Sequence, residues 1–181
     1  MLIKEKLKLI LTSDNVIEEI NKNMDFLLEN IYEIKYMINF DQKNPHHHLD
    51  LWNHTLYAIS LSKNDFDIRI TLLLHDIGKP FSYQDEEIRH FHNHPKVSAI
   101  MGEKILKRLE FNSKYITKIC YLIENHDTPI KEQEIKENYE LQLQRYEVQR
   151  CDALAHHPDK LEKRKKYLKK TKIIFNNNQK R

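Results

Sequence analysis

A histidine and an aspartate stand next to each other at His75-Asp76, within the run LLLHDIGKP at residues 72–80. Imidazole and carboxylate groups are both ligands of divalent metal ions. Successive residues of a helix point about 100° apart, so both side chains can face one ion only if the backbone leaves the helix here. Gly78 and Pro80 favour such an end. The doublet therefore predicts part of a metal site where an apolar helix ends.

Further residues along the chain have the chemistry to complete such a site, and each lies on an expected helix or at its end. They are His54, His94, His126 and Asp152. A single histidine on an apolar helix face is more often a core residue than a ligand, so the residue types alone do not assign them. Two histidines with two carboxylates can hold one divalent ion and leave positions open for water and substrate, as a hydrolytic metal site requires.

The chain resembles the HD-domain superfamily of metal-dependent phosphohydrolases. The residues that carry the resemblance are His54 in LWNHTL, His75-Asp76 in HDIGK and Asp152 in CDALAH. Their order, a histidine, a histidine-aspartate pair and a late aspartate, is the superfamily's signature, and it spans most of the chain. A His-Asp pair alone occurs often by chance, but the apolar HDIGKP run between the other two segments is much more specific.

Within the superfamily, the chain most resembles the HD domain attached to bacterial CCA-adding tRNA nucleotidyltransferases. This rests on residues 75–81, on HFHNH at residues 90–94 and on DALAH at residues 152–156. The second segment departs from the pattern His-Phe-x-Gly-His-Glu, because Asn93 replaces the glycine and Pro95 the glutamate. Asparagine tolerates the left-handed conformation, so the loop can keep its shape. CCA synthesis is not expected of these residues, because they leave no room for the nucleotidyltransferase head and contain no motif for it. A Gly-rich phosphate loop is not expected either, with only 2 glycines.

The resemblance implies a role for each site residue and one or two divalent ions, with Mn, Ni, Co, Fe, Mg and Zn all compatible. The implied metal ligands are His54, His75, Asp76, His94, His126 and Asp152. Asp76 would also accept the proton of the attacking water, and Lys79 would offset charge on the phosphate. His94 and His126 would complete a second metal site that shares Asp76, or would contact the phosphate beside a single ion. The alternative in which neither histidine reaches the site also stays open.

Three further residues are candidates for contact with the substrate. His90 can lie at the mouth of the pocket, while Arg145 and Arg150 precede Asp152 on the same expected helix. For both arginines the ordinary alternative is a position on the helix surface. The histidines at positions 46–48 are expected to be polar loop residues, one of which can lie near the site.

The composition is typical of a soluble helical protein. Of 181 residues, 40% are hydrophobic and 31% charged, and only 2 glycines and 5 prolines supply turns. No apolar stretch approaches the ~20 residues that span a membrane, and the N-terminus lacks the features of a signal peptide. We therefore expect a cytoplasmic protein without membrane contact, in which Cys120 and Cys151 are reduced and buried.

Apolar residues recur at helical spacing, and no segment shows the alternation of a strand. We therefore predict an all-α fold: a compact multi-helix HD-domain bundle over residues 1–181, with the metal site between core helices. The expected helices cover residues 14–37, 51–61, 66–74, 95–109 and 113–126, then 131–157 in one or two pieces, and a last one from 158. Asp50 and Asp65 are expected N-caps, as are Ser13 or Asp14 for the first helix.

The C-terminal segment 160–181 is strongly basic. It holds ten Lys or Arg and one acid, Glu162, a balance of +9, so the rest of the chain carries about −6 against the net +3. Such a segment can contact RNA or another phosphate-rich partner. We favour the ordinary alternative of a solvated terminal helix, packed through Leu161, Leu168 and Phe175, with a frayed end at residues 176–178.

Two functions follow from these features. The first is a metal-dependent phosphohydrolase that uses metal-activated water on small nucleotide phosphomonoesters or phosphodiesters, such as 2′,3′-cyclic nucleotides. The alternative is a non-catalytic module that binds metal and nucleotide or RNA through the HD site and the basic tail. The full set of ligand types, with Lys79 beside it, favours the enzyme. The metal, the natural substrate and the oligomeric state are not fixed by the sequence.

Overall fold

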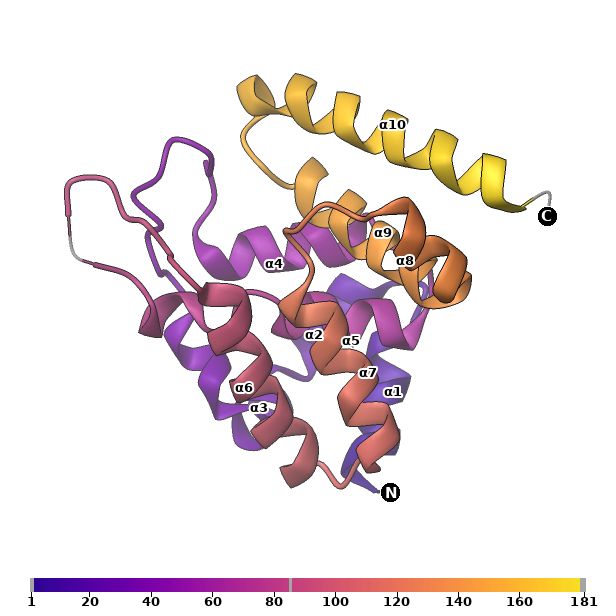
Figure 1. The fold of residues 1–181 in the computed structure, drawn as a ribbon. Coiled ribbons are helices and arrows are strands. Elements are labelled where there is room, and N and C mark those ends of the chain that lie inside the picture. Colours follow the sequence, from indigo (N-terminus) through magenta and orange to yellow (C-terminus); the bar gives the residue numbers. More distant parts are fainter. Residues whose placement is uncertain (1, 85, 180–181) are drawn as a thin grey trace.

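The computed structural model describes residues 2–84 and 86–179, and over these residues the chain is all-helical, without strands. Figure 1 shows the helices as a compact bundle, with α10 along its outside. The α-helices are α1 (Ile3–Leu11), α2 (Val16–Lys22), α3 (Met24–Asn30), α4 (Leu51–Ser60), α5 (Phe66–Leu74), α6 (His94–Arg108), α7 (Ser113–Glu124), α8 (Glu132–Glu137), α9 (Tyr139–Leu154) and α10 (Leu161–Gln179). Short 3-10 helices cover Tyr32–Tyr36, Lys79–Phe81 and Pro158–Lys160. The predicted fold class is confirmed.

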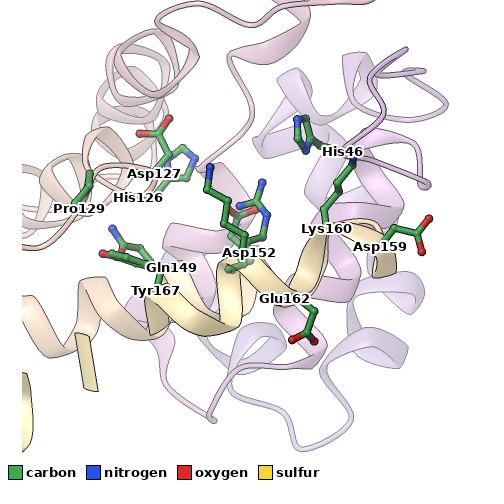
Figure 2. A pocket seen from close by; sticks show the side chains of 13 residues that line it. His46, His126, Asp127, Pro129, Gln149, Asp152, Asp159, Lys160, Glu162 and Tyr167 are labelled. Atoms are coloured by element: carbon green, nitrogen blue, oxygen red, sulfur yellow. The ribbon is translucent and has the colours of Figure 1, made fainter. Parts of the chain in front are cut away.

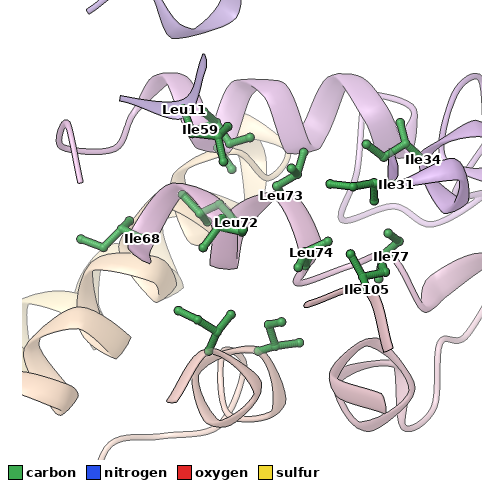
Figure 3. Packing of buried hydrophobic residues seen from close by; sticks show 14 of the residues in the cluster. Leu11, Ile31, Ile34, Ile59, Ile68, Leu72, Leu73, Leu74, Ile77 and Ile105 are labelled. Atoms are coloured by element: carbon green, nitrogen blue, oxygen red, sulfur yellow. The ribbon is translucent and has the colours of Figure 1, made fainter. Parts of the chain in front are cut away.

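Helix α5 lies at the centre of the bundle and packs against α1, α4, α6, α7 and α9. Every residue from Ile68 to Leu74 is buried, and Figure 3 shows Leu72, Leu73 and Leu74 among side chains of the neighbouring elements. A helix surrounded by others must be apolar on all sides, which explains the unbroken LLL run. Each of these leucines contributes about 1.5–3 kcal/mol through burial. The end of α5 therefore delivers His75-Asp76 into the interior.

Polar side chains fix where the central helices begin. Asp50 accepts a hydrogen bond from the backbone N–H of Asn53 at the start of α4, at 3.1 Å. Asp65 caps α5 in the same way, at 3.1 Å from the N–H of Ile68. Both expected caps are confirmed, and such a cap typically contributes about 1 kcal/mol.

Gly78 lets the chain after the doublet lie directly against α6. Its N–H donates to Ser98 Oγ at 2.9 Å. A Cβ at this position would lie 2.6 Å from the Ser98 backbone nitrogen, closer than any real contact. The absence of a side chain is therefore what permits the turn beyond Asp76 to pack beside the helix that carries His94.

The single helix expected over residues 14–37 is wrong, because the chain forms α2, α3 and a 3-10 helix there. Asn23 separates α2 from α3, and its Nδ2 donates to the Glu19 carbonyl at 2.9 Å. Asn30, at the end of α3, bonds the Phe26 carbonyl in the same way, at 2.8 Å. Such side chains compete with the backbone for helix carbonyls, so the apolar period continues while the helix does not. The N-cap position of α2 is held by Asn15, not by either expected residue.

Helix α10 packs on α8 and α9 through an apolar cluster of its own. Phe175 lies among Ile135 of α8, side chains of α9 and Ile130 of the segment before α8. Leu168 is buried as expected, while Leu161 is only partly buried. The frayed end expected at residues 176–178 is wrong, because the helix continues to Gln179. Among the described residues, no helix combines the length and apolar character needed to cross a membrane.

Candidate metal centre

The six predicted metal ligands come together in the interior of the bundle. They are His54 on α4, His75 and Asp76 at the end of α5, His94 at the start of α6, His126 just after α7, and Asp152 near the end of α9. All are buried except His94, which is partly exposed. Helices far apart in the sequence thus supply one cluster of nitrogen and oxygen donors.

Four of these residues form one ligand set. His54 Nε2 lies 3.0 Å from Asp152 Oδ1, and His75 Nε2 lies 3.2 Å from Asp76 Oδ2. Across the set, His54 Nε2 is 3.7 Å from Asp76 Oδ2, and His75 Nε2 is 3.6 Å from Asp152 Oδ1. The four ligand atoms lie within 4.8 Å of one another, so one ion can reach them all.

A second ligand set uses the other oxygen of Asp76. His94 Nε2 lies 3.2 Å from Asp76 Oδ1, and His126 Nε2 lies 3.8 Å from the same oxygen. Asp76 therefore turns one oxygen to each set. This places His94 and His126 at the centre, and the alternative in which neither reaches it is wrong. A single ion with two histidines free for phosphate remains compatible, as do two ions that share Asp76.

Backbone carbonyls orient the ligand histidines. Each ligand histidine turns its Nδ1 to a carbonyl oxygen. The pairs are His54 with Ala155 at 3.3 Å, His75 with Leu72 at 2.6 Å, His94 with Phe91 at 2.9 Å, and His126 with Ile123 at 2.7 Å. An Nδ1 beside a carbonyl carries the proton, which leaves the lone pair on Nε2. All four Nε2 atoms face the carboxylates of the centre, as the ligands of a metal ion should.

The charges of the centre favour a bound cation. Burial opposes ionisation of Asp76, but His75 and Lys79 outweigh it and hold the pKa of the carboxyl well below its usual range. Burial also opposes ionisation of Asp152, whose pKa the neighbouring histidines, His156 first, hold well below its usual range. His75 is buried too, yet the two carboxylates raise its pKa to about 10. Two buried, ionised carboxylates require positive partners: without metal these are Lys79 and His75, whose Nε2 then holds a proton that a bound ion would displace.

The donor set fits a divalent ion. His75 Nε2 is fully buried and has no hydrogen-bond partner among the described residues, although Asp76 Oδ2 is near. Buried polar atoms without a partner are rare, and a bound ion is one explanation for them. Imidazole nitrogens with carboxylate oxygens suit transition metals such as Mn, Fe, Co, Ni or Zn.

Lys79 extends the centre on one side. Its Nζ lies 2.7 Å from Asp76 Oδ2 and donates to Gln42 Oε1 at 3.0 Å. It also lies over the Phe91 ring, 5.4 Å from the ring centroid. The lysine is buried, so its charge acts on the centre and not on solvent.

Two cavities open from the metal centre. The smaller, of about 220 Å³, is lined by Asp76, Lys79, His94 and His126 among others. The larger, of about 680 Å³, lies under the C-terminal segment and shares His126 and Asp152 with the first. Figure 2 shows Asp152 in its middle, with Tyr167 of α10 next to Gln149 on one side.

The sequence profile of the HD domain matches residues 46–174. The chain belongs to the HD domain family. HD domains are typically metal-dependent hydrolases, and all six ligands of the centre lie inside the matched range. An A-adding tRNA nucleotidyltransferase of Deinococcus radiodurans is 33% identical to this HD domain over 88 residues. That match covers 44% of this chain and 20% of the relative, so the chain corresponds to about a fifth of the relative's length.

Two histidines at the centre of this HD domain were not among the predicted site residues. His156 Nδ1 lies 3.7 Å from Asp152 Oδ1, and its ring is 5.3 Å from that of His54. The His47 ring lies 4.5 Å from that of His156. Burial lowers the pKa of His156 to about 4, and burial likewise lowers the pKa of His47. A spacing of one helical turn after Asp152 could have identified His156. His47 fits the expectation that one of the histidines at positions 46–48 lies near the site, although nothing in the sequence singles it out among the three.

Arg145 lies outside both cavities of the metal centre and contacts the segment that follows His126. Its Nε donates to the Asn125 carbonyl at 2.9 Å, and Nη2 donates to the Thr128 carbonyl at 2.8 Å. The side chain is buried and also pairs with Glu134 at 3.1 Å. The structure therefore gives Arg145 a positioning role behind His126.

Arg150 and His90 also lie away from the two cavities. Arg150 pairs with Glu147 at 2.7 Å and donates to the Leu61 carbonyl at 2.6 Å, beside a separate surface hollow. His90 is exposed and stacks on His92 with ring centroids 5.7 Å apart. In the part of the chain that the structure describes, no hydrogen bond or ion pair joins either residue to a predicted metal ligand.

Proposed function

We propose that this HD domain is a metal-dependent phosphohydrolase that acts on small nucleotide phosphates. The observation that carries the proposal is Asp76, whose two oxygens face two sets of nitrogen and oxygen donors beside an open cavity. A bound divalent ion lowers the pKa of a coordinated water towards neutrality and polarises a phosphoryl oxygen. Such chemistry suits the hydrolysis of a phosphate ester.

The residues of the centre support this function in different ways. Asp76 would hold the metal and could accept a proton from the attacking water, since its two oxygens face different donor sets. Lys79 Nζ, 2.7 Å from Asp76 Oδ2, can offset negative charge that gathers on the phosphate. Phosphoryl transfer depends mostly on positioning and charge stabilisation, and these residues supply both.

The cavities support a nucleotide as the substrate. The larger one falls in the size range of small-molecule sites, which is about 300–1,000 Å³. Its wall includes Pro129, Ala153 and Tyr167, which offer apolar surface to a base or ribose next to the metal centre. A 2′,3′-cyclic phosphodiester and a 5′-monophosphate both fit this description, so both are proposed substrates.

Metal-dependent turnover tests the proposal. The protein is stripped of metal, refilled separately with Mn, Ni, Co, Mg or Zn, and incubated with 2′,3′-cyclic AMP or AMP. We expect turnover with at least one metal and its loss, by at least 100-fold, in Asp76→Ala. Asp25→Ala, which removes an exposed carboxylate from α3, should retain wild-type turnover.

Equal turnover by wild type and Asp76→Ala would overturn the proposal. If the protein takes up metal but shows no turnover with any metal or either nucleotide, the result would instead favour the non-catalytic module that binds metal and nucleotide.

A further inference from the structure

Arg164 is the one arginine of α10, and it faces the metal centre from the C-terminal side. It lines both the small cavity and the larger one. Several other arginines are held by protein acceptors: Arg69, Arg108, Arg145 and Arg150 each bond carbonyls or carboxylates. Among the described residues, no hydrogen bond or ion pair joins Arg164 to a partner. The side chain is partly buried, which lowers its pKa, and the nearby charge of the Asp152 carboxylate opposes that shift. A guanidinium so placed is available to a ligand.

Helix α10 holds Arg164 in a defined position. Tyr167, one turn further on, donates from its hydroxyl to Gln149 Oε1 at 2.9 Å and accepts from the Ile130 N–H at 3.1 Å. The Tyr146 hydroxyl donates to the Leu168 carbonyl at 3.2 Å. These bonds tie the helix to α9 and to the segment before α8, so Arg164 is not on a loose tail.

Positive charge gathers on this side of the cavity. Lys160 and Lys163 line the larger cavity with Arg164. Burial first, and then these three cations, lower the pKa of His46 on the same wall. Two acids also line this side. Glu162 pairs with Lys165 at 3.3 Å, and Figure 2 shows its carboxylate directed away from Asp152, while Asp159 lies 3.6 Å from His157 Nδ1.

We propose that Arg164 binds the phosphate group of the substrate at the metal centre, which rests on the proposed function. A guanidinium can bond two phosphate oxygens at once, and such charge-assisted pairs are about twice as strong as neutral hydrogen bonds. Lys160 and Lys163 attract the anion towards the cavity. The basic C-terminal segment then forms one wall of the substrate site.

Phosphate binding to the metal-loaded protein tests this role without requiring turnover. Inorganic phosphate is titrated calorimetrically into wild type, Arg164→Ala, Arg164→Gln and Lys170→Ala, and the KM for AMP is measured beside it. We expect both Arg164 variants to bind phosphate at least tenfold more weakly, which corresponds to about 1.4 kcal/mol. Lys170 is exposed on α10 and lines neither cavity, so its variant removes one charge and should match wild type.

Metal content and thermal melting of each variant separate this effect from damage to the centre or the fold. Unchanged phosphate affinity in Arg164→Gln, or no phosphate binding by wild type, would overturn the inference. Phosphate binding that depends on Arg164 without hydrolysis by wild type would uphold the inference and overturn the proposed function. Hydrolysis by wild type, together with phosphate binding that does not depend on Arg164, would uphold the proposed function and overturn the inference.

Discussion

Asp76 is the residue on which the two ligand sets depend, because each of its oxygens faces a different set. The other ligands serve one set each. Truncating Asp76 therefore removes a donor from both, while truncating His94 or His126 leaves the set of His54, His75 and Asp152 intact. This difference in position explains why Asp76, among six ligands, is the informative site for mutation.

The effect of burial on single groups can be tested through the pKa values of the two cysteine thiols. Burial raises the pKa of the Cys120 thiol to about 11 and that of Cys151 to about 12, above the ordinary value of about 8.5. Because only the thiolate reacts, about one Cys120 thiol in a thousand is reactive at pH 8. We expect alkylation of the native protein by iodoacetamide to be slow and to rise about tenfold per pH unit up to pH 11. Mass spectrometry after timed exposure measures it.

Protein unfolded in urea should react at the rate of a free thiol and serves as the control. A native rate that levels off near pH 9 would contradict this prediction.

The metal ligands could be predicted from sequence because their types, their order and the segments around them are those of the HD superfamily. His156 carries a local signal, one turn after Asp152. His47 and Arg164 carry none, because they reach the centre through the folding of a loop and of a distant helix. Side chains that tertiary packing alone brings to a site leave no spacing in the sequence.

At the scale of elements, the capping residues are the part of the fold that sequence predicts best. Asp50 and Asp65 act on a backbone group three residues away, so the signal is local. The division of residues 14–37 into separate helices was not predicted, since the apolar period runs through it. There Asn23 and Asn30 decide the outcome by bonding carbonyls of their own helices.

The two glycines of the chain give a matched pair of variants. Gly78→Ala would bring a Cβ to 2.6 Å from the Ser98 backbone nitrogen, which cannot move without shifting α6. Gly102→Ala would place one 2.9 Å from the end of the Ile123 side chain, which can rotate, and alanine favours the helix by about 1 kcal/mol. We expect Gly78→Ala to lower the free energy of unfolding by about 1–3 kcal/mol, and Gly102→Ala to change it less.

Urea unfolding of the two variants beside wild type measures this difference. Equal stability of both variants would show that the turn after Asp76 can move away from Ser98.

At the scale of the whole molecule, the metal centre joins helices from α4 to α9. An ion that binds this folded arrangement and not the unfolded chain must stabilise the entire bundle. At a free metal concentration of 100 times Kd, the free energy of unfolding rises by about 2.7 kcal/mol. For a chain of this size that corresponds to a rise of roughly 5–10 °C in melting temperature.

Melting temperatures of metal-free and refilled protein, with Asp76→Ala beside them, check this expectation. The Asp76 variant should show little or no rise. His48→Ala, which removes an exposed histidine of the loop, should keep the full rise. A rise of the same size in Asp76→Ala would assign the stabilisation to metal bound elsewhere, such as at the loop histidines.

Three of the ligand histidines share one detail: His75, His94 and His126 each bond the carbonyl of the residue three positions earlier. A contact within its own turn of chain therefore helps to set the direction of each ring. In the folded chain these histidine rings are already oriented by the carbonyl contacts, so the ion does not have to orient them. A site preorganised in this way loses little conformational entropy on binding, so its affinity for metal is not spent on ordering side chains.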